Sequence, residues 1–157
     1  MNDMDLKAKI LNDIRIDLSD EFDRNFQRKA FFDQPWPPRK INSKGSILMV
    51  TGKLRRSIRS RVDADSVTWE TSETYAAIHN FGGYITVTSK MKRFFWYKYK
   101  STKDDAWKHM ALMKVGSKIH IPQRRFIGEH PEVVKRANEI IRRNIVNAAQ
   151  QLSKRLV

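Results

Sequence analysis

Five apolar residues recur at every fourth position near the start of the chain: Ile10, Ile14, Leu18, Phe22 and Phe26. Because side chains four residues apart share one face of an α-helix, this spacing predicts a long amphipathic helix over residues 3–32. An apolar stripe of that length must be buried, so the rest of the chain has to supply elements that pack against it.

A second long helix is predicted at the other end of the chain. Pro131 suits the first turn of a helix, and one face stays apolar as far as residue 152. That face consists of Val134, Ala137, Ile141, Ile145, Ala148 and Leu152. Between the two helices lie short segments with strand-like patterns. We therefore expect an α+β fold in which long N- and C-terminal helices pack on a small, mostly antiparallel sheet.

The segment after the first helix is not predicted to be helical. Residues 34–45 contain three prolines within four positions, which remove hydrogen-bond donors and force extended geometry. This connector is expected to be anchored by Trp36. Residues 51–60 then predict a short basic helix that buries Leu54, and residues 61–71 have the pattern of a β-hairpin.

The stretch YAAIHNFGG, residues 75–83, predicts a short central helix. Its apolar face would be formed by Tyr75, Ile78 and Phe81 or Gly82. Gly82 and Gly83 supply the left-handed stop of the helix. A helix this short is stable only between packed neighbours. We therefore interpret His79 as a packing or hydrogen-bonded residue rather than a catalytic one.

Composition limits the kind of protein this chain is. Its 157 residues, 40% of them hydrophobic, fit one domain spanning residues 1–157. The lack of cysteine excludes disulfides, thiolate metal sites and cysteine catalysis. No apolar run approaches a membrane span, and the acidic, interrupted start does not resemble a signal peptide. We expect a soluble protein with no membrane partner.

The net charge of +14 is unevenly distributed. Residues 84–157 hold 17 of the 31 Lys and Arg but only 5 of the 17 Asp and Glu. This asymmetry favours a polyanionic neighbour, nucleic acid first, although a basic face also fits an acidic protein surface.

Residues 84–118 combine nine Lys or Arg with seven aromatic residues, and they are predicted to form an inserted basic aromatic arm. Strands are expected at 85–89 and 94–99, and a short helix at 103–114. Within the run KRFFWYKYK, Lys92–Lys100, exposed aromatics between cations would suit stacking on single-stranded nucleic acid. We favour a contact with another subunit, since large aromatics are typical interface anchors. The candidates for that contact are Phe95, Trp96 and Tyr97.

No pattern of catalytic or metal-binding residues emerges. The four histidines lack the close spacing of zinc ligands, and no nucleophile or phosphate-loop motif is present. Ser57 and Ser72 have no recognisable catalytic setting. The carboxylates in and near the predicted hairpin could supply a pair for hydrolysis, but acids at such positions are common for solubility; they are Asp63, Asp65, Glu70 and Glu73. We expect no enzyme activity and no cofactor.

The segment IPQRRFIG, residues 121–128, places two arginines side by side. In extended backbone, Arg124 and Arg125 would point in opposite directions. One could hold an internal carboxylate while the other projects from the surface.

Four motifs in order resemble the bacteriophage virion morphogenesis family, which includes the Mu-like G proteins and the tail completion proteins of the head-to-tail neck. They are WPPRK at 36–40, LxxTGKLRRSI at 48–58, YAAIHNFGG at 75–83 and IPQRRFIG at 121–128. The resemblance covers most of residues 20–150, whereas residues 84–118 match no pattern of the family and look like an insertion.

The resemblance implies a structural, non-enzymatic α+β subunit that completes the tail or joins tail to head. It also implies neck, portal or tail proteins as partners, a homo-oligomeric ring on assembly, and contact with DNA in the channel. The protein would occupy the host cytoplasm during assembly and then the virion neck or tail. A nucleic-acid-binding protein that uses Lys92–Lys100 is the alternative.

The family motifs give each matched residue an expected role. The turn residues are Gly52, Gly82, Gly83 and Gly128, with Pro122 before the last motif. The residues expected to pack the junctions are Trp36, Tyr75, His79 and Phe126, and Leu54 and Phe81 are further structural residues of the motifs. The candidates for contacts with subunits or partners are Arg55, Arg56, Arg124 and Arg125.

Overall fold

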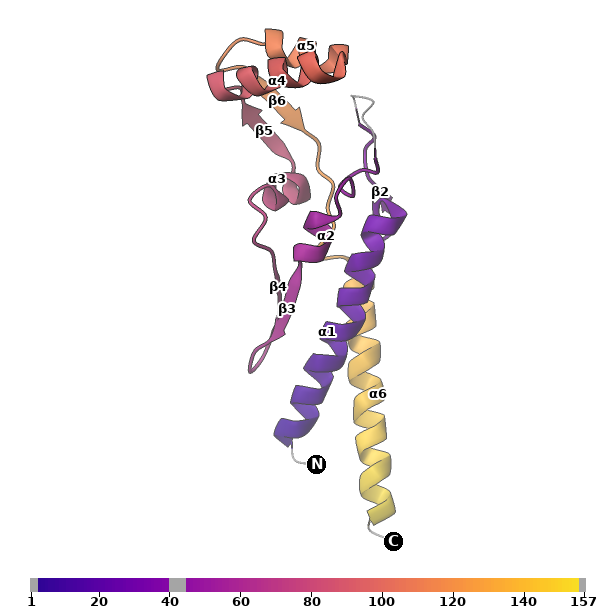
Figure 1. Ribbon diagram of the computed structural model, residues 1–157. Helices are drawn as coiled ribbons and strands as arrows, with labels where there is room; N and C mark the ends of the chain where they lie inside the picture. Colours follow the sequence, from indigo (N-terminus) through magenta and orange to yellow (C-terminus); the bar gives the residue numbers. More distant parts are fainter. Residues whose placement is uncertain (1–2, 40–44, 156–157) are drawn as a thin grey trace.

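The structure is a computed structural model that describes residues 3–39 and 45–155 (Figure 1). Its elements in chain order are α1 (Asp3–Arg28), β1 (Ala30–Phe31), β2 (Gln34–Pro35), α2 (Lys53–Ser57), β3 (Arg59–Val62), β4 (Val67–Glu70), α3 (Ala76–Phe81), β5 (Gly83–Thr86), α4 (Ser89–Thr102), α5 (Asp105–Leu112), β6 (Lys118–Ile121) and α6 (Pro131–Arg155). Residues 40–44, part of the predicted connector, lie outside the described residues.

The two terminal helices lie antiparallel along each other, so the N- and C-terminal ends are at the same end of the molecule (Figure 1). Ion pairs join them where Arg136 of α6 contacts Asp17 (3.2 Å) and Glu21 (3.1 Å) of α1. Further along, Asn144 accepts a hydrogen bond from Lys9 at 2.7 Å. Although burial opposes ionisation of Glu21, hydrogen bonding from Arg28 and the charge of Arg136 keep the pKa of this carboxyl below its ordinary value.

The strands form three separate two-stranded antiparallel sheets, β1–β2, β3–β4 and β5–β6. In the second sheet Arg59 pairs with Glu70 at one end and Val62 with Val67 at the other. The third sheet runs from the Gly83–Ile121 pair to the Thr86–Lys118 pair. Long-range pairing of β5 with β6 therefore closes a loop that contains α4 and α5.

This loop is a distinct projection, which we call the arm: β5, α4, α5 and β6, residues 83–121. Figure 1 shows α4 and α5 at the end of the molecule opposite the chain termini, on top of the β5–β6 ribbon. The arm thus extends away from the helix pair.

Two hydrophobic clusters stabilise the rest of the chain. One contains Leu18, Phe22 and Phe31, with the half-buried Trp69 of β4 packed edge-on against Phe22. The other cluster packs Phe26 of α1 against residues of the connector, α2, α3 and the segment after β6. Apolar burial of this kind contributes about 25 cal/mol per Å² to stability, so the helices depend on these contacts more than on helix propensity.

The α+β class, the long terminal helices and the antiparallel pairing are confirmed. The first helix ends at Arg28 rather than residue 32, because Lys29 adopts a left-handed conformation with φ 56°. The strand expected at 94–99 is wrong, since these residues lie inside α4. No helix among the described residues is long and apolar enough to cross a lipid bilayer.

Candidate interaction site

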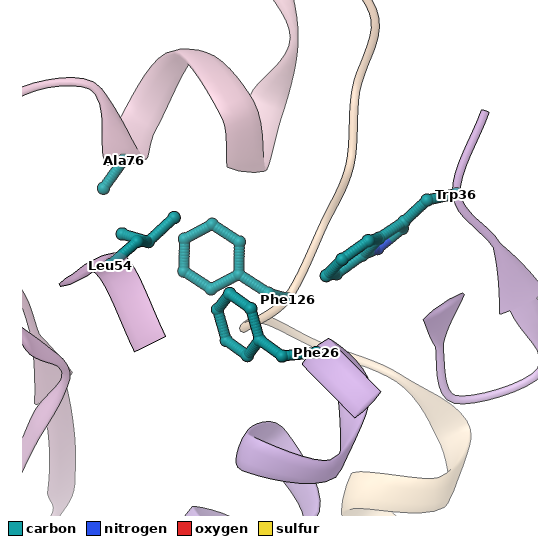
Figure 2. Packing of buried hydrophobic residues seen from close by; sticks show 5 residues of the cluster. All are labelled: Phe26, Trp36, Leu54, Ala76 and Phe126. Carbon is teal, nitrogen blue, oxygen red and sulfur yellow. The ribbon is translucent and has the colours of Figure 1, made fainter. Parts of the chain in front are cut away.

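One residue from each of the four sequence motifs packs with Phe26 of α1 in a buried cluster, which we call the junction: Phe26, Trp36, Leu54, Ala76 and Phe126. Figure 2 shows Phe126 next to Phe26, with the Trp36 ring directed toward them and Leu54 and Ala76 on the far side. The ring centroids of Phe26 and Phe126 are 5.2 Å apart. Segments far apart in sequence therefore share one core.

Trp36 anchors the connector to this junction in two ways. Its ring packs edge-on against Phe26, with 5.7 Å between centroids. Its indole Nε1 donates a hydrogen bond to the carbonyl oxygen of Arg125 at 2.6 Å. The indole thus joins residues from the first and last motifs.

Two buried asparagines hold the segment that contains Phe126. The Asn80 side chain accepts from the backbone N–H groups of Phe126 (2.9 Å) and Ile127 (3.2 Å) and donates to the carbonyl of Ile127 (3.0 Å). Asn25 donates to the carbonyl of Phe126 at 3.1 Å and accepts from the backbone N–H of Phe32 at 3.0 Å. Sequence reasoning missed both. The available signal was an amide on the apolar face of a predicted helix.

The base of the arm is attached to the same place. The backbone N–H of Arg124 donates to the carbonyl of His79 at 2.7 Å, and the Gln123 side chain donates to the carbonyl of Asn80 at 3.1 Å. Because β5 starts directly after α3 and β6 ends just before Gln123, both strands of the arm leave from this point. The junction therefore fixes how the arm is presented.

Gly82 connects α3 to the arm and cannot be replaced without strain. It has φ 72°, and a Cβ at this position would lie 2.9 Å from the backbone nitrogen of Gln123. Gly52, Gly83 and Gly128 also have positive φ, and Pro122 directly follows β6.

The buried face of α3 differs from the predicted one. The helix buries Ala76 and Asn80, whereas Phe81 is 67% exposed and Tyr75 39% exposed. The predicted apolar face that includes Tyr75 and Phe81 is therefore wrong, because the helix is rotated to bring the Asn80 amide against the Phe126 segment.

His79 is half-buried and packs edge-on against Tyr75, with 6.0 Å between ring centroids. Its Nδ1 is buried and has no hydrogen-bond partner among the described residues. Burial, followed by the charge of Arg124, lowers the pKa of His79 below its ordinary value. This shift favours the neutral imidazole, and no carboxylate of the described residues is hydrogen-bonded to its Nδ1.

The acids considered for hydrolysis show no catalytic arrangement in the described part of the chain. Ser57, Ser72, Glu70 and Glu73 line an open pocket of about 530 Å³. Glu73 forms an ion pair with Lys53 at 3.2 Å, and the Ser57 hydroxyl donates to a main-chain carbonyl of α2. Within residues 3–39 and 45–155, no group of three or more His, Cys, Asp or Glu is placed to hold a metal ion.

The two arginines of the last motif point in different directions, as the sequence predicts. Arg124 is buried, and its guanidinium donates to the carbonyls of Pro37 (2.9 Å) and Pro38 (3.1 Å) rather than to a carboxylate. Burial, with the charge of Arg39, lowers the pKa of Arg124. The half-buried Arg125 lies over the ring of Phe31, 5.6 Å from its centroid.

The arginines of α2 also differ from each other. Arg55 is half-buried and forms a bidentate ion pair with Asp23 of α1, which raises the pKa of Arg55. Arg56 is exposed and donates to the carbonyl of Thr51 at 2.9 Å. In this chain, Arg55 and Arg124 hold segments together, and Arg56 remains at the surface.

The end of the arm is a pair of helices, α4 and α5, where the sequence predicts a strand at 94–99 and a short helix at 103–114. Thr88 caps α4 by accepting from the Met91 N–H at 3.2 Å, and Asp104 caps α5 by accepting from the Ala106 N–H at 2.9 Å. Phe95 is buried against Trp107, with 6.0 Å between ring centroids. Phe95 is therefore a packing residue of the arm, unlike its neighbours.

One side of α4 carries only cations and aromatics; we call it the outer face, formed by Lys90, Arg93, Trp96, Tyr97 and Lys100. The spacing of three and four residues puts these side chains on one side of the helix, and all of them are exposed. Helix α4 contains no acidic residue, and the arm's two acids, Asp104 and Asp105, lie at the start of α5. The outer face is thus a continuous cationic aromatic surface.

In comparison with protein families, a model described as the phage virion morphogenesis family matches residues 2–146. Comparison with curated proteins and with solved structures finds no significant match.

Proposed function

Because the chain belongs to the phage virion morphogenesis family, we propose that this structural protein completes the tail or joins the tail to the head through contacts with other virion proteins. The match over residues 2–146 carries the proposal. Family membership points to assembly rather than catalysis. The partners are neck, portal or tail proteins, and the protein acts as a homo-oligomeric ring in the virion neck after assembly in the host cytoplasm.

The exposed arm supports a role that depends on contacts. Its outer face presents Trp96 and Tyr97 between cations, and aromatics of this kind are common interface anchors. Because hydrogen bonds from Gln123 and Arg124 fix the base of the arm, little conformational entropy is lost when it binds. Arg56 is a further candidate for a contact with a partner, since its side chain is exposed.

The test is a phage or prophage that lacks the gene. Negative-stain microscopy should show separate heads and tails, or unfinished tails, and infectivity should be lost. Wild-type protein supplied from a plasmid should restore joined particles. Normal infectious particles without the protein would refute the proposed role.

The same system tests the arm. Tyr97→Ser removes an aromatic ring that is 66% exposed, and Ile16→Ser is a matched control on the exposed side of α1. We expect the Ile16 variant to restore infectivity and the Tyr97 variant to fail, while circular dichroism shows both folded. Equal rescue by the two variants would exclude the outer face as the contact.

Nucleic-acid binding is the second candidate function, favoured by the three cations and two aromatics of the outer face. Cations meet phosphates while aromatic rings stack on unpaired bases, so affinity should fall steeply with salt and with Trp96→Ala. Contact with DNA in the channel would follow from the same surface. Fluorescence anisotropy with labelled single- and double-stranded DNA measures it, and no binding at low salt would exclude it.

A further inference from the structure

Helix α6 has two apolar faces, and only one of them is covered by the described part of the chain. The covered face includes Val133, Ile140 and Asn144, and it lies against α1. Ile140 is 4% exposed, and the Asn144 side chain donates to Asp13 of α1 at 3.0 Å.

The second face, which we call the seam, shares five residues with the apolar stripe that the sequence predicts for this helix, and Asn138 takes the place of Ala137. Its members are Val134, Asn138, Ile141, Ile145, Ala148 and Leu152. Val134, Ile145 and Leu152 are 59%, 52% and 57% exposed. At about 100° per residue, the seam lies roughly a third of a turn around the helix from the face that packs on α1.

The spacing of the seam is that of a coiled-coil interface. Successive members alternate between four and three residues apart, so Val134, Ile141 and Ala148 fill d positions and Asn138, Ile145 and Leu152 fill a positions of a heptad repeat. A single Asn at an a position is a known determinant of register between paired helices. An ordinary surface helix needs only one apolar stripe, so this second one indicates a helical partner.

The charges beside the seam indicate the chemistry of that partner. Lys135 and Arg142 are exposed at the flanking e positions, and no acid occupies an e or g position over the length of the seam. The nearest exposed acid on this helix, Glu139, lies roughly 140° away from the seam at about 100° per residue. Residues at e and g positions select the partner helix by charge, so acidic flanks fit this surface.

A second copy of the chain is a poorer fit. In antiparallel pairing, the e positions of two copies of α6 face each other, so Lys135 and Arg142 would meet cations on a molecule that already carries +14. The exposed apolar residues of α1, Met4 and Ile16, are twelve positions apart and make no complementary stripe.

We propose that the α6 seam binds an amphipathic helix of another virion protein, whose apolar stripe is flanked by acidic residues. The virion origin of that helix rests on the proposed function. The apolar stripe and acidic flanks expected of that helix do not rest on the proposed function, since they follow from the residues of α6.

The test uses the full chain and three synthetic peptides of about three heptads. The first has Leu at a and d and Glu at e and g; the second has Lys in place of Glu; the third has the composition of the first in scrambled order. Fluorescence anisotropy should show binding of the first peptide only. Equal binding of the scrambled peptide would overturn the proposal, because net charge alone would then explain the affinity.

A matched pair of variants identifies the surface. Ile145→Ser changes a seam residue, and Val146→Ser changes the next residue, which is 47% exposed and lies off the seam. We expect the first variant to weaken peptide binding at least tenfold and the second less than twofold. Leu152→Ser should reproduce the effect of Ile145→Ser. Equal effects at positions 145 and 146 would overturn the proposal.

Sedimentation of the chain alone tests the competing occupant. A dimer that Ile145→Ser abolishes would assign the seam to a second copy and overturn the proposal; a monomer supports it. These measurements use purified protein, so their failure leaves the gene-deletion phenotype intact. Conversely, normal infectious particles formed without the gene would refute the assembly role but would leave the peptide-binding result unchanged.

Discussion

Removing the Asn80 amide tests whether the junction depends on it. In Asn80→Ala, the N–H groups of Phe126 and Ile127 lose their acceptor, and the carbonyl of Ile127 loses a donor. A net hydrogen bond contributes about 1 kcal/mol, and a buried group left unsatisfied costs about 1–3 kcal/mol. Asn80 is 7% exposed, so water cannot easily replace the amide. We expect a loss of about 3 kcal/mol in the free energy of unfolding.

Urea titration followed by far-UV circular dichroism measures this free energy, and a thermal scan gives the melting temperature. For a chain of this size, 1 kcal/mol corresponds to about 2–4 °C, so the melting temperature should fall by about 6–12 °C. Amide hydrogen exchange should also accelerate in β5 and β6, because Asn80 lies next to the base of the arm.

The matched control is Asn147→Ala, which removes an exposed amide from α6 and should change stability by less than about 0.5 kcal/mol. A loss for Asn80→Ala as small as that for Asn147→Ala would refute the reasoning, since the three hydrogen bonds would then contribute nothing measurable to the junction.

Three further changes test other parts of the structure. Gly82→Ala should lower the free energy of unfolding by more than about 2 kcal/mol, because it adds a steric clash with the Gln123 backbone to the strain of positive φ. Gly116→Ala introduces the same type of strain in open space. Urea titration of both variants therefore separates the clash from the strain. Because the pKa of His79 is lowered in the folded protein, the unfolded chain binds a proton at this residue more readily. The free energy of unfolding should therefore fall as the pH drops below the ordinary pKa of 6.5. His79→Gln should reduce that fall when unfolding is compared at about pH 7 and about pH 5. Phe95→Ala removes a buried ring of the arm and should lower the stability of the α4–α5 pair by about 3–5 kcal/mol. Amide hydrogen exchange should therefore accelerate in α4 and α5, while the amides of the junction stay protected.

The terminal helices could be predicted because their pattern repeats over many turns. The four-residue spacing from Ile10 to Phe26 continues for longer than a typical strand, and Pro131 marks the start of α6. The arm could not be predicted as well, because a run of aromatics favours a strand when propensity is considered alone. The helical signal was present in the Thr88 cap and in Met91, Phe95 and Tyr99, which are four residues apart.

Which face of a helix is buried could not be read from the helix itself. Half of the predicted apolar face of α6 is exposed, since α1 lies against Val133, Ile140 and Asn144 instead. The role of Asn80 likewise depends on where the chain places residues 126–127, far away in sequence. Position in the fold, and not residue type, decides these contacts.

The two candidate surfaces lie toward opposite ends of the molecule, with the junction between them (Figure 1). The outer face of α4 is cationic and aromatic, and the seam of α6 is apolar with cationic flanks. Neither surface covers the other, so two different partners can bind one chain at the same time without competing for the same residues. A protein that joins two parts of a particle needs two contact surfaces, and the junction packs together the segments that connect these two. The proposed joining role therefore depends on the buried motif cluster, because its packing sets where both surfaces are held within the chain.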